Sequence, residues 1–332
     1  GLNDTNGRSS PTQVGTNTNW SNLIAGTEGA HIAVKTDGTL WSWGQNKNGV
    51  LAQNNAGDGT NVYSSPTQIG TDTTWGTFLA TGTTSFAAIK TTGTLWVWGN
   101  GYQGQLGLNQ GGAATQYSSP VQVGTDTTWR TLSRGGDGTN NYLATKTDGT
   151  FWAWGRGDYG ILGLNAETYR SSPTQVGTDT TWAILAHQQQ DENNVAMATK
   201  TDGTLWSWGS AGAGIPSSQS GARGYNNSAL GAVSSPIQVG SNTTWPKNKN
   251  QPWRLSVSKL QVGAIKTDGT LWAWGQLKGG QLGLNQNENN QPGFSSPVQV
   301  GTQTDWESIY IHGANTSKFQ TAQATTKSAT PG

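Results

Sequence analysis

The sequence predicts an all-β protein, a β-propeller built of four-stranded antiparallel blades, from three observations. First, the segment Ser-Ser-Pro-x-Gln opens six copies of one unit, at Ser9, Ser64, Ser118, Ser171, Ser234 and Ser295. Second, the first five copies continue to Lys-Thr-x-Gly-Thr-x-Trp-x-Trp-Gly. Third, the chain has 17 tryptophans although only 32% of its residues are hydrophobic. A repeat of roughly 50 to 60 residues with several short strands and turns is typical of a propeller blade.

The second copy shows the strands expected in each blade, at residues 67–69, 75–80, 85–90 and 95–99. Pro66 marks a sheet edge or turn, because proline has no N–H to donate to a strand ladder. In four other copies the hairpin before the last strand reads Asp-Gly, as at Asp37-Gly38. This dipeptide predicts a type I′ turn, in which both central residues have positive φ.

The two tryptophans of each Trp-x-Trp segment lie on one face of their strand, because side chains alternate along a strand. A smaller residue separates them, such as Val97 between Trp96 and Trp98. Large side chains on one face and a gap on the other allow neighbouring blades to pack closely. These ten tryptophans are therefore expected in the core rather than in a ligand platform.

The copies predict a single propeller domain over residues 1–332, with six blades favoured. Residues 1–8 are interpreted as the tail of a preceding copy, because Gly1-Leu2-Asn3 matches Gly107-Leu108-Asn109. The sixth copy is incomplete, since Ser328-Ala329-Thr330 follows Lys327 where the Trp-x-Trp strand should begin. Seven blades are expected instead if the chain is a fragment of a longer protein.

The repeat resembles that of the regulator of chromosome condensation family, in the Asp-Gly-Thr-Leu-Trp-x-Trp-Gly run and in the Gly-Gln-Leu-Gly segment. The resemblance covers nearly the whole chain and implies a ring-shaped propeller. It leaves the function open, because members of one fold perform unrelated tasks. The near-identity of the copies makes the chain look more like the bacterial and viral members than like the eukaryotic nucleotide-exchange factor.

Composition argues against several classes of function. The net charge is +1, only 11% of residues are charged, and no basic stripe is present, so no nucleic-acid partner is expected. The absence of cysteine excludes thiolate chemistry, and no long apolar run predicts insertion into a membrane. His31, His187 and His312 are spread over different copies, and the repeated aspartates fit local turns. No metal, cofactor or enzymatic activity is therefore expected.

Copies four and five carry insertions, at residues 209–233 and 245–255. Insertions in repeat proteins map to loops and often form a binding face. Aromatic and arginine residues are also the usual anchors of interfaces. The candidate partner-binding residues are therefore those of these two loops, Arg223, Tyr225, Lys247, Lys249, Trp253 and Arg254.

The function predicted from these features is a non-enzymatic structural or binding module. It would be displayed outside a cell or on a virus particle, as part of a larger assembly, and would present its rim loops to a protein or glycan. One alternative is an intracellular propeller that acts by protein–protein binding, as an exchange factor or a protein inhibitor. A second alternative is an enzyme with a site in a central channel.

Overall fold

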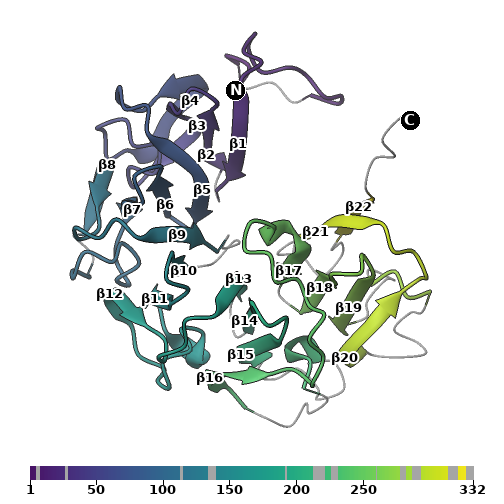
Figure 1. Ribbon diagram of the computed structural model, residues 1–332. Coiled ribbons are helices and arrows are strands. Elements are labelled where there is room, and N and C mark those ends of the chain that lie inside the picture. Colours follow the sequence, from purple (N-terminus) through teal and green to yellow (C-terminus); the bar gives the residue numbers. More distant parts are fainter. Residues whose placement is uncertain are drawn as a thin grey trace. The chain divides into compact units, whose positions relative to one another are not determined.

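The computed structural model describes residues 1–4, 8–26, 29–112, 115–133, 140–190, 193–211, 221–225, 231–258, 260–276, 282–285, 293–312 and 321–326. This part of the chain is all-β, with five four-stranded sheets and one two-stranded sheet (Figure 1). Neighbouring strands run antiparallel, as in the β5–β6 and β6–β7 pairs. The predicted fold class is thereby confirmed. None of the described residues forms a helix long and apolar enough to cross a membrane.

The six sheets follow one another along the chain. The first consists of β1 (Trp20–Ala25), β2 (His31–Lys35), β3 (Leu40–Lys47) and β4 (Asp58–Gln68). The second consists of β5 (Trp75–Thr81), β6 (Ser85–Lys90), β7 (Leu95–Asn100) and β8 (Gln116–Gln122). The third consists of β9 (Trp129–Leu132), β10 (Asn141–Lys146), β11 (Phe151–Gly155) and β12 (Arg170–Gln175).

The remaining sheets repeat this order. The fourth consists of β13 (Trp182–Gln190), β14 (Asn193–Lys200), β15 (Leu205–Ala211) and β16 (Val233–Gln238). The fifth consists of β17 (Leu255–Val257), β18 (Gln261–Ile265), β19 (Leu271–Gln276) and β20 (Gly293–Val300). The last pairs β21 (Trp306–His312) with β22 (Thr321–Thr326). The described connections contain the 3₁₀ segments η2 (Asp158–Gly160), η4 (Gly221–Arg223) and η5 (Pro252–Arg254).

Each complete sheet takes its fourth strand from the opening of the next copy of the repeat. The strand that contains Pro66 is β4, and it pairs with β3 of the first sheet, with Gln68 opposite Trp41. The expectation that residues 67–69 and 75–80 share one blade is therefore wrong. The chain leaves the Trp-x-Trp strand, passes through a loop and returns antiparallel along the same sheet. Pro66 then lies on an outer strand, where its missing N–H disrupts no ladder.

The Asp-Gly hairpin is a different turn from the one predicted. Gly38 has φ +78°, whereas Asp37 is not among the residues with positive φ. Gly38 N donates to Lys35 O at 2.9 Å, and Lys35 N donates to Thr39 O at 3.0 Å. This is a type I turn followed by a left-handed glycine, a common three-residue hairpin. The Asp37 carboxylate accepts the N–H of Thr39 at 2.9 Å, which keeps Asp37 itself right-handed.

Neighbouring sheets are joined by the second tryptophan of four of the five Trp-x-Trp segments. Trp98, Trp154, Trp208 and Trp274 are fully buried, which confirms their place in the core, whereas the other six tryptophans of these segments are half-buried. The Nε1 of Trp98 donates to Val50 O at 2.9 Å, in the loop of the preceding sheet. The other three make the equivalent bonds to Gln105, Ile161 and Ala222. Each ring thus fills the gap between two sheets and satisfies its polar atom there.

The chain divides into two compact units. The first contains Gly1–Asp148, Trp152–Arg156 and Tyr169–Thr174, and the second contains Gly149–Phe151, Gly157–Thr168 and Gln175–Gly332. In the first unit β5 lies between β1 and β9 and contacts both (Figure 1). In the second unit β17 packs against β13 and β21. A single domain with six or seven blades remains a prediction.

Candidate binding groove

Five lysines of the repeated Lys-Thr segment are enclosed by pairs of tryptophan rings. The Nζ of Lys90 lies 3.7 Å from the ring centroid of Trp96 and 4.7 Å from that of Trp75. The same enclosure recurs at Lys35, Lys146, Lys200 and Lys266. A cation over an aromatic face contributes about 0.5–2 kcal/mol. No role was predicted for these lysines, although their fixed position before every hairpin was a visible signal.

In three sheets an aspartate neutralises the enclosed lysine. The Nζ–Oδ2 distance is 2.5 Å in each of the pairs Lys90–Asp72, Lys146–Asp126 and Lys200–Asp179. The other carboxylate oxygen of Asp72 accepts the N–H of Thr74 at 2.7 Å. The predicted role of these aspartates in local turns is confirmed. The same carboxylates also accept a hydrogen bond from a lysine that lies on a strand 18 residues or more away in sequence.

The lysine–aspartate pairs predict a loss of stability in acid. Burial alone would raise the pKa of Asp72, but hydrogen bonds from Lys90 and Thr74 and the charge of Lys90 lower it to about 2. The pKa of Asp126 is lowered to about 2 in the same way. A carboxyl with a lowered folded-state pKa stabilises the fold above its unfolded pKa of about 3.9, and this contribution is lost as pH falls towards the folded value.

We therefore expect the free energy of unfolding, measured by urea titration, to fall between about pH 4 and pH 2. The double variant Asp72→Asn with Asp126→Asn should be less stable than the wild type near neutral pH and should lose less on acidification. If the free energy of unfolding falls equally steeply with pH in the wild type and in the double variant, the two lysine–aspartate pairs are not the cause of the acid sensitivity.

The first and fifth sheets lack this aspartate. Asn17 and Asn242 stand three residues before Trp20 and Trp245, where Asp72 precedes Trp75. Asn242 keeps the local turn, since its Oδ1 accepts the N–H of Thr244 at 2.8 Å. Within the described residues, neither Lys35 nor Lys266 forms a salt bridge. Burial lowers the pKa of Lys266, and the nearby charge of Asp268 partly opposes this.

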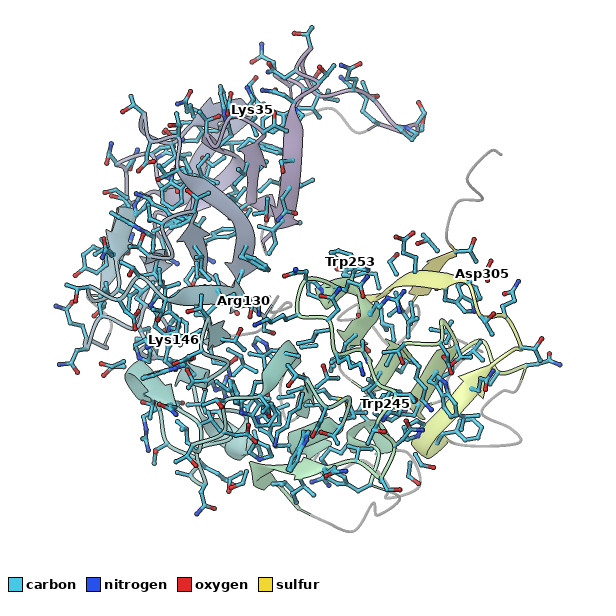
Figure 2. All side chains as sticks on the ribbon, viewed as in Figure 1. Lys35, Arg130, Lys146, Trp245, Trp253 and Asp305 are labelled. Carbon is cyan, nitrogen blue, oxygen red and sulfur yellow. The ribbon has the colours of Figure 1, made fainter. Side chains whose placement is uncertain are left out.

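A groove of about 650 Å³ crosses the hairpin ends of the first three sheets, within the first unit. Its lining includes eight residues with hydroxyl groups, Ser21, Thr36, Thr73, Thr77, Thr91, Thr92, Thr127 and Thr147. Three basic residues, Lys35, Lys90 and Arg130, line it together with one carboxylate, Asp37. Figure 2 shows Lys35 in the first sheet and Arg130 in the third. Phe78, on β5 between them, adds a half-buried aromatic ring. Grooves of this size accommodate a short segment of a ligand.

Three of the predicted partner-binding residues serve the interior of the second unit. Arg223 is 3% exposed and donates to Gly231 O at 2.6 Å. The hydroxyl of Tyr225 donates to Ser207 O, and burial raises the pKa of Tyr225 to about 12. Arg254 is also buried and donates to Lys266 O at 3.1 Å. Their guanidinium and phenol groups donate hydrogen bonds to buried backbone carbonyls. A long polar side chain in an insertion can serve this purpose as readily as it can bind a partner.

The other three predicted residues reach the surface to different degrees. Trp253 is 45% exposed on η5, which lies against β21 (Figure 2). Lys247 is exposed and Lys249 is half-buried on the same connection between β16 and β17. Arg223 and Tyr225 lie near one another on the η4 connection, apart in sequence from this loop. Residues 212–220 and 226–230 of the fourth-copy insertion lie outside the described residues. In the part of the chain that the structure describes, no group of three His, Asp or Glu side chains could hold a metal ion.

Comparison with known proteins agrees with the repeat and the fold. Residues 148–184 match the regulator of chromosome condensation (RCC1) repeat. The E3 ubiquitin-protein ligase HERC2 of Homo sapiens is 25% identical over 258 residues, which cover 76% of this chain but only 5% of HERC2. The crystal structure of human WBSCR16 superimposes with a TM-score of 0.68 at 16% identity, over 91% of this chain and 73% of that one. Prp20p from Saccharomyces cerevisiae gives a TM-score of 0.61 at 17% identity, over 85% and 64%.

These matches show one RCC1 repeat, at residues 148–184, and a fold like that of the RCC1-like propellers. The structural similarities, at such low identity, concern the fold alone. The chain spans about 5% of the length of the curated relative HERC2, so nothing of that protein's ligase activity transfers to it.

Proposed function

We propose that the protein is a non-enzymatic binding module that holds a partner protein in the groove of its first unit. The observation that supports this most directly is the groove itself. Hydroxyl groups, Phe78 and Arg130 line an open depression beside the lysines that the tryptophan rings enclose. A groove lined by an aromatic ring and an arginine has a composition common in protein-recognition surfaces.

The comparisons favour protein–protein binding over display on a surface. The structure of Prp20p was described together with that protein's binding properties to Gsp1p and histones. Binding of that general kind was the alternative expected from sequence. The bacterial or viral type rests on the near-identity of the copies, and the extracellular or virion location rests on composition; the relatives named above support neither. A glycan as partner rests only on the exposed Trp253 loop.

The groove can be tested with peptides selected from a random-sequence phage library on the immobilised protein. We expect selected peptides to bind with micromolar Kd in fluorescence anisotropy. Thr77→Trp should weaken them at least about tenfold, because Thr77 is exposed on β5 and a bulky ring there fills the groove.

Val62→Trp is the matched control, since Val62 is 54% exposed and lies outside the groove lining. Both variants should keep the circular dichroism spectrum and melting temperature of the wild type. Selected peptides that bind equally well to Thr77→Trp would place the interaction elsewhere and contradict the proposal.

A further inference from the structure

The basic residues of the groove differ in how their charges are balanced. Lys90 forms a salt bridge to Asp72 at 2.5 Å. Lys35 is enclosed in the same way, with its Nζ 3.7 Å from the Trp41 ring centroid and 4.9 Å from that of Trp20. No carboxylate forms a salt bridge with Lys35 in the described residues, because Asn17 stands where Asp72 stands in the second sheet. Two adjacent sheets thus carry a lysine at the same position, and in the second sheet an aspartate pairs with it, whereas in the first an asparagine takes the place of that aspartate.

Asp37 is the carboxylate in the groove closest in sequence to Lys35, and its oxygens are engaged by other groups. Its Oδ1 accepts the N–H and the hydroxyl of Thr39, at 2.9 and 2.6 Å. Its pKa is lowered by the Thr39 hydrogen bonds first and only in part by the charge of Lys35. Asp37 therefore acts on Lys35 through space without forming a salt bridge. Among the residues that the structure describes, the contact that Asp72 makes with Lys90 has no counterpart at Lys35.

A carboxylate can approach the enclosed lysine from solvent. In the second sheet the Lys90 side chain is 10% exposed, whereas Asp72, which caps it, is 37% exposed. The carboxylate thus stands on the solvent side of the ammonium group. Lys35 is 6% exposed and held between two rings, so its charge keeps a fixed position. A partly desolvated, fixed cation gains more from a hydrogen-bonded anion than a flexible surface lysine does.

Arg130 is a further basic residue of the groove lining. It follows Trp129 on β9, in the third sheet, and is half-buried. Burial lowers the pKa of its guanidinium, which remains charged because arginine titrates far above neutral pH. The groove therefore has a cation in its first sheet and another in its third, with the hydroxyls of the second sheet between them.

We propose that the groove binds an extended, acidic segment of a partner protein. One carboxylate of that segment takes, beside Lys35, the place that Asp72 takes beside Lys90. This proposal rests on the proposed function and specifies its ligand. The net charge of +1 and only three basic side chains in the groove favour a peptide over a nucleic acid, whose phosphates need a longer basic track.

The test uses three asparagine–aspartate exchanges and a fluorescein-labelled peptide of alternating glutamate and serine. Asn17→Asp supplies the missing counter-charge for Lys35 and should weaken binding about three- to fivefold. Asp72→Asn removes the counter-charge of Lys90 and should strengthen binding about threefold. Asn242→Asp makes the same exchange at Lys266, outside the groove lining, and should leave the affinity unchanged.

All three variants are expected to fold, because both residues already occupy this turn position in the chain. Aspartate accepts the threonine N–H in the second sheet and asparagine does so in the fifth. Melting temperatures check this. The glutamine–serine counterpart of the peptide should bind at least about tenfold more weakly, and raising the salt concentration should weaken only the glutamate peptide.

Different outcomes separate this proposal from the proposed function. If Thr77→Trp prevents the binding of library-selected peptides but Asn17→Asp leaves the affinity for the glutamate peptide unchanged, the proposal of an acidic ligand is overturned. The proposal of a protein-binding groove then still holds. If no peptide binds in a manner sensitive to Thr77→Trp, the proposed function fails as well. An oligothymidine that binds more tightly than the glutamate peptide, and more weakly after Asn17→Asp, would replace the acidic peptide with a nucleic acid and overturn the proposal.

Discussion

Replacing Trp154 with alanine is expected to lower the free energy of unfolding by about 3–5 kcal/mol, as for large aromatic truncations in a core. The Trp154 side chain is fully buried, and its Nε1 donates to Gln105 O at 3.0 Å. It also contacts Trp129 and Tyr142, with centroid distances of 5.9 and 5.6 Å. Truncation leaves a cavity between two sheets and an unpaired backbone carbonyl, and the rigid sheets cannot close over it. Urea titration at neutral pH measures the change.

Trp253→Ala is the control for this experiment, because Trp253 is 45% exposed on a loop. It should cost less than about 1 kcal/mol, as substitutions of partly exposed residues usually do. Equal losses in the two variants would show that stability does not depend on the inter-sheet tryptophans.

The second large effect is expected at the hairpin glycines. Gly203 has φ +85°, and a Cβ added there would lie 1.9 Å from the carbonyl oxygen of Thr243. The hairpin is held in this position because Trp245 N donates to Gly203 O at 3.1 Å. Gly203→Ala therefore combines a left-handed alanine with a backbone clash between adjacent sheets. We expect a loss of about 2–5 kcal/mol in the free energy of unfolding.

Gly240→Ala separates the two causes. Gly240 has φ +61°, and nothing lies within 4 Å of the position of an added Cβ. Its variant should show only the conformational cost of about 1–2 kcal/mol. If the two variants have the same melting temperature, the close approach of the hairpin to the neighbouring turn does not add to the cost of the substitution. The packing described at Gly203 would then be wrong.

The sequence determined the repeating elements because each is encoded by local, recurring patterns. The alternation of Trp96 and Trp98 placed both on one face of a strand, and the burial of Trp98 follows from it. The Asp-Gly dipeptides located the hairpins, although the turn type was wrong. Asp-Gly fits a left-handed glycine in either turn, and the Asp37–Thr39 hydrogen bond selected the type I form.

Only the tertiary structure decided how these elements combine. The strand that contains Pro66 joined the preceding sheet, because an open strand edge pairs with whichever segment returns beside it. Arg223 and Arg254 turned inward to bind carbonyls that no sequence pattern reveals. The pairing of Lys90 with Asp72 depends on a strand meeting a distant turn, and so does the absence of a salt bridge to Lys35 among the described residues. The groove requires three sheets to lie side by side. Such contacts depend on which distant segments become neighbours, and local sequence preferences do not determine that.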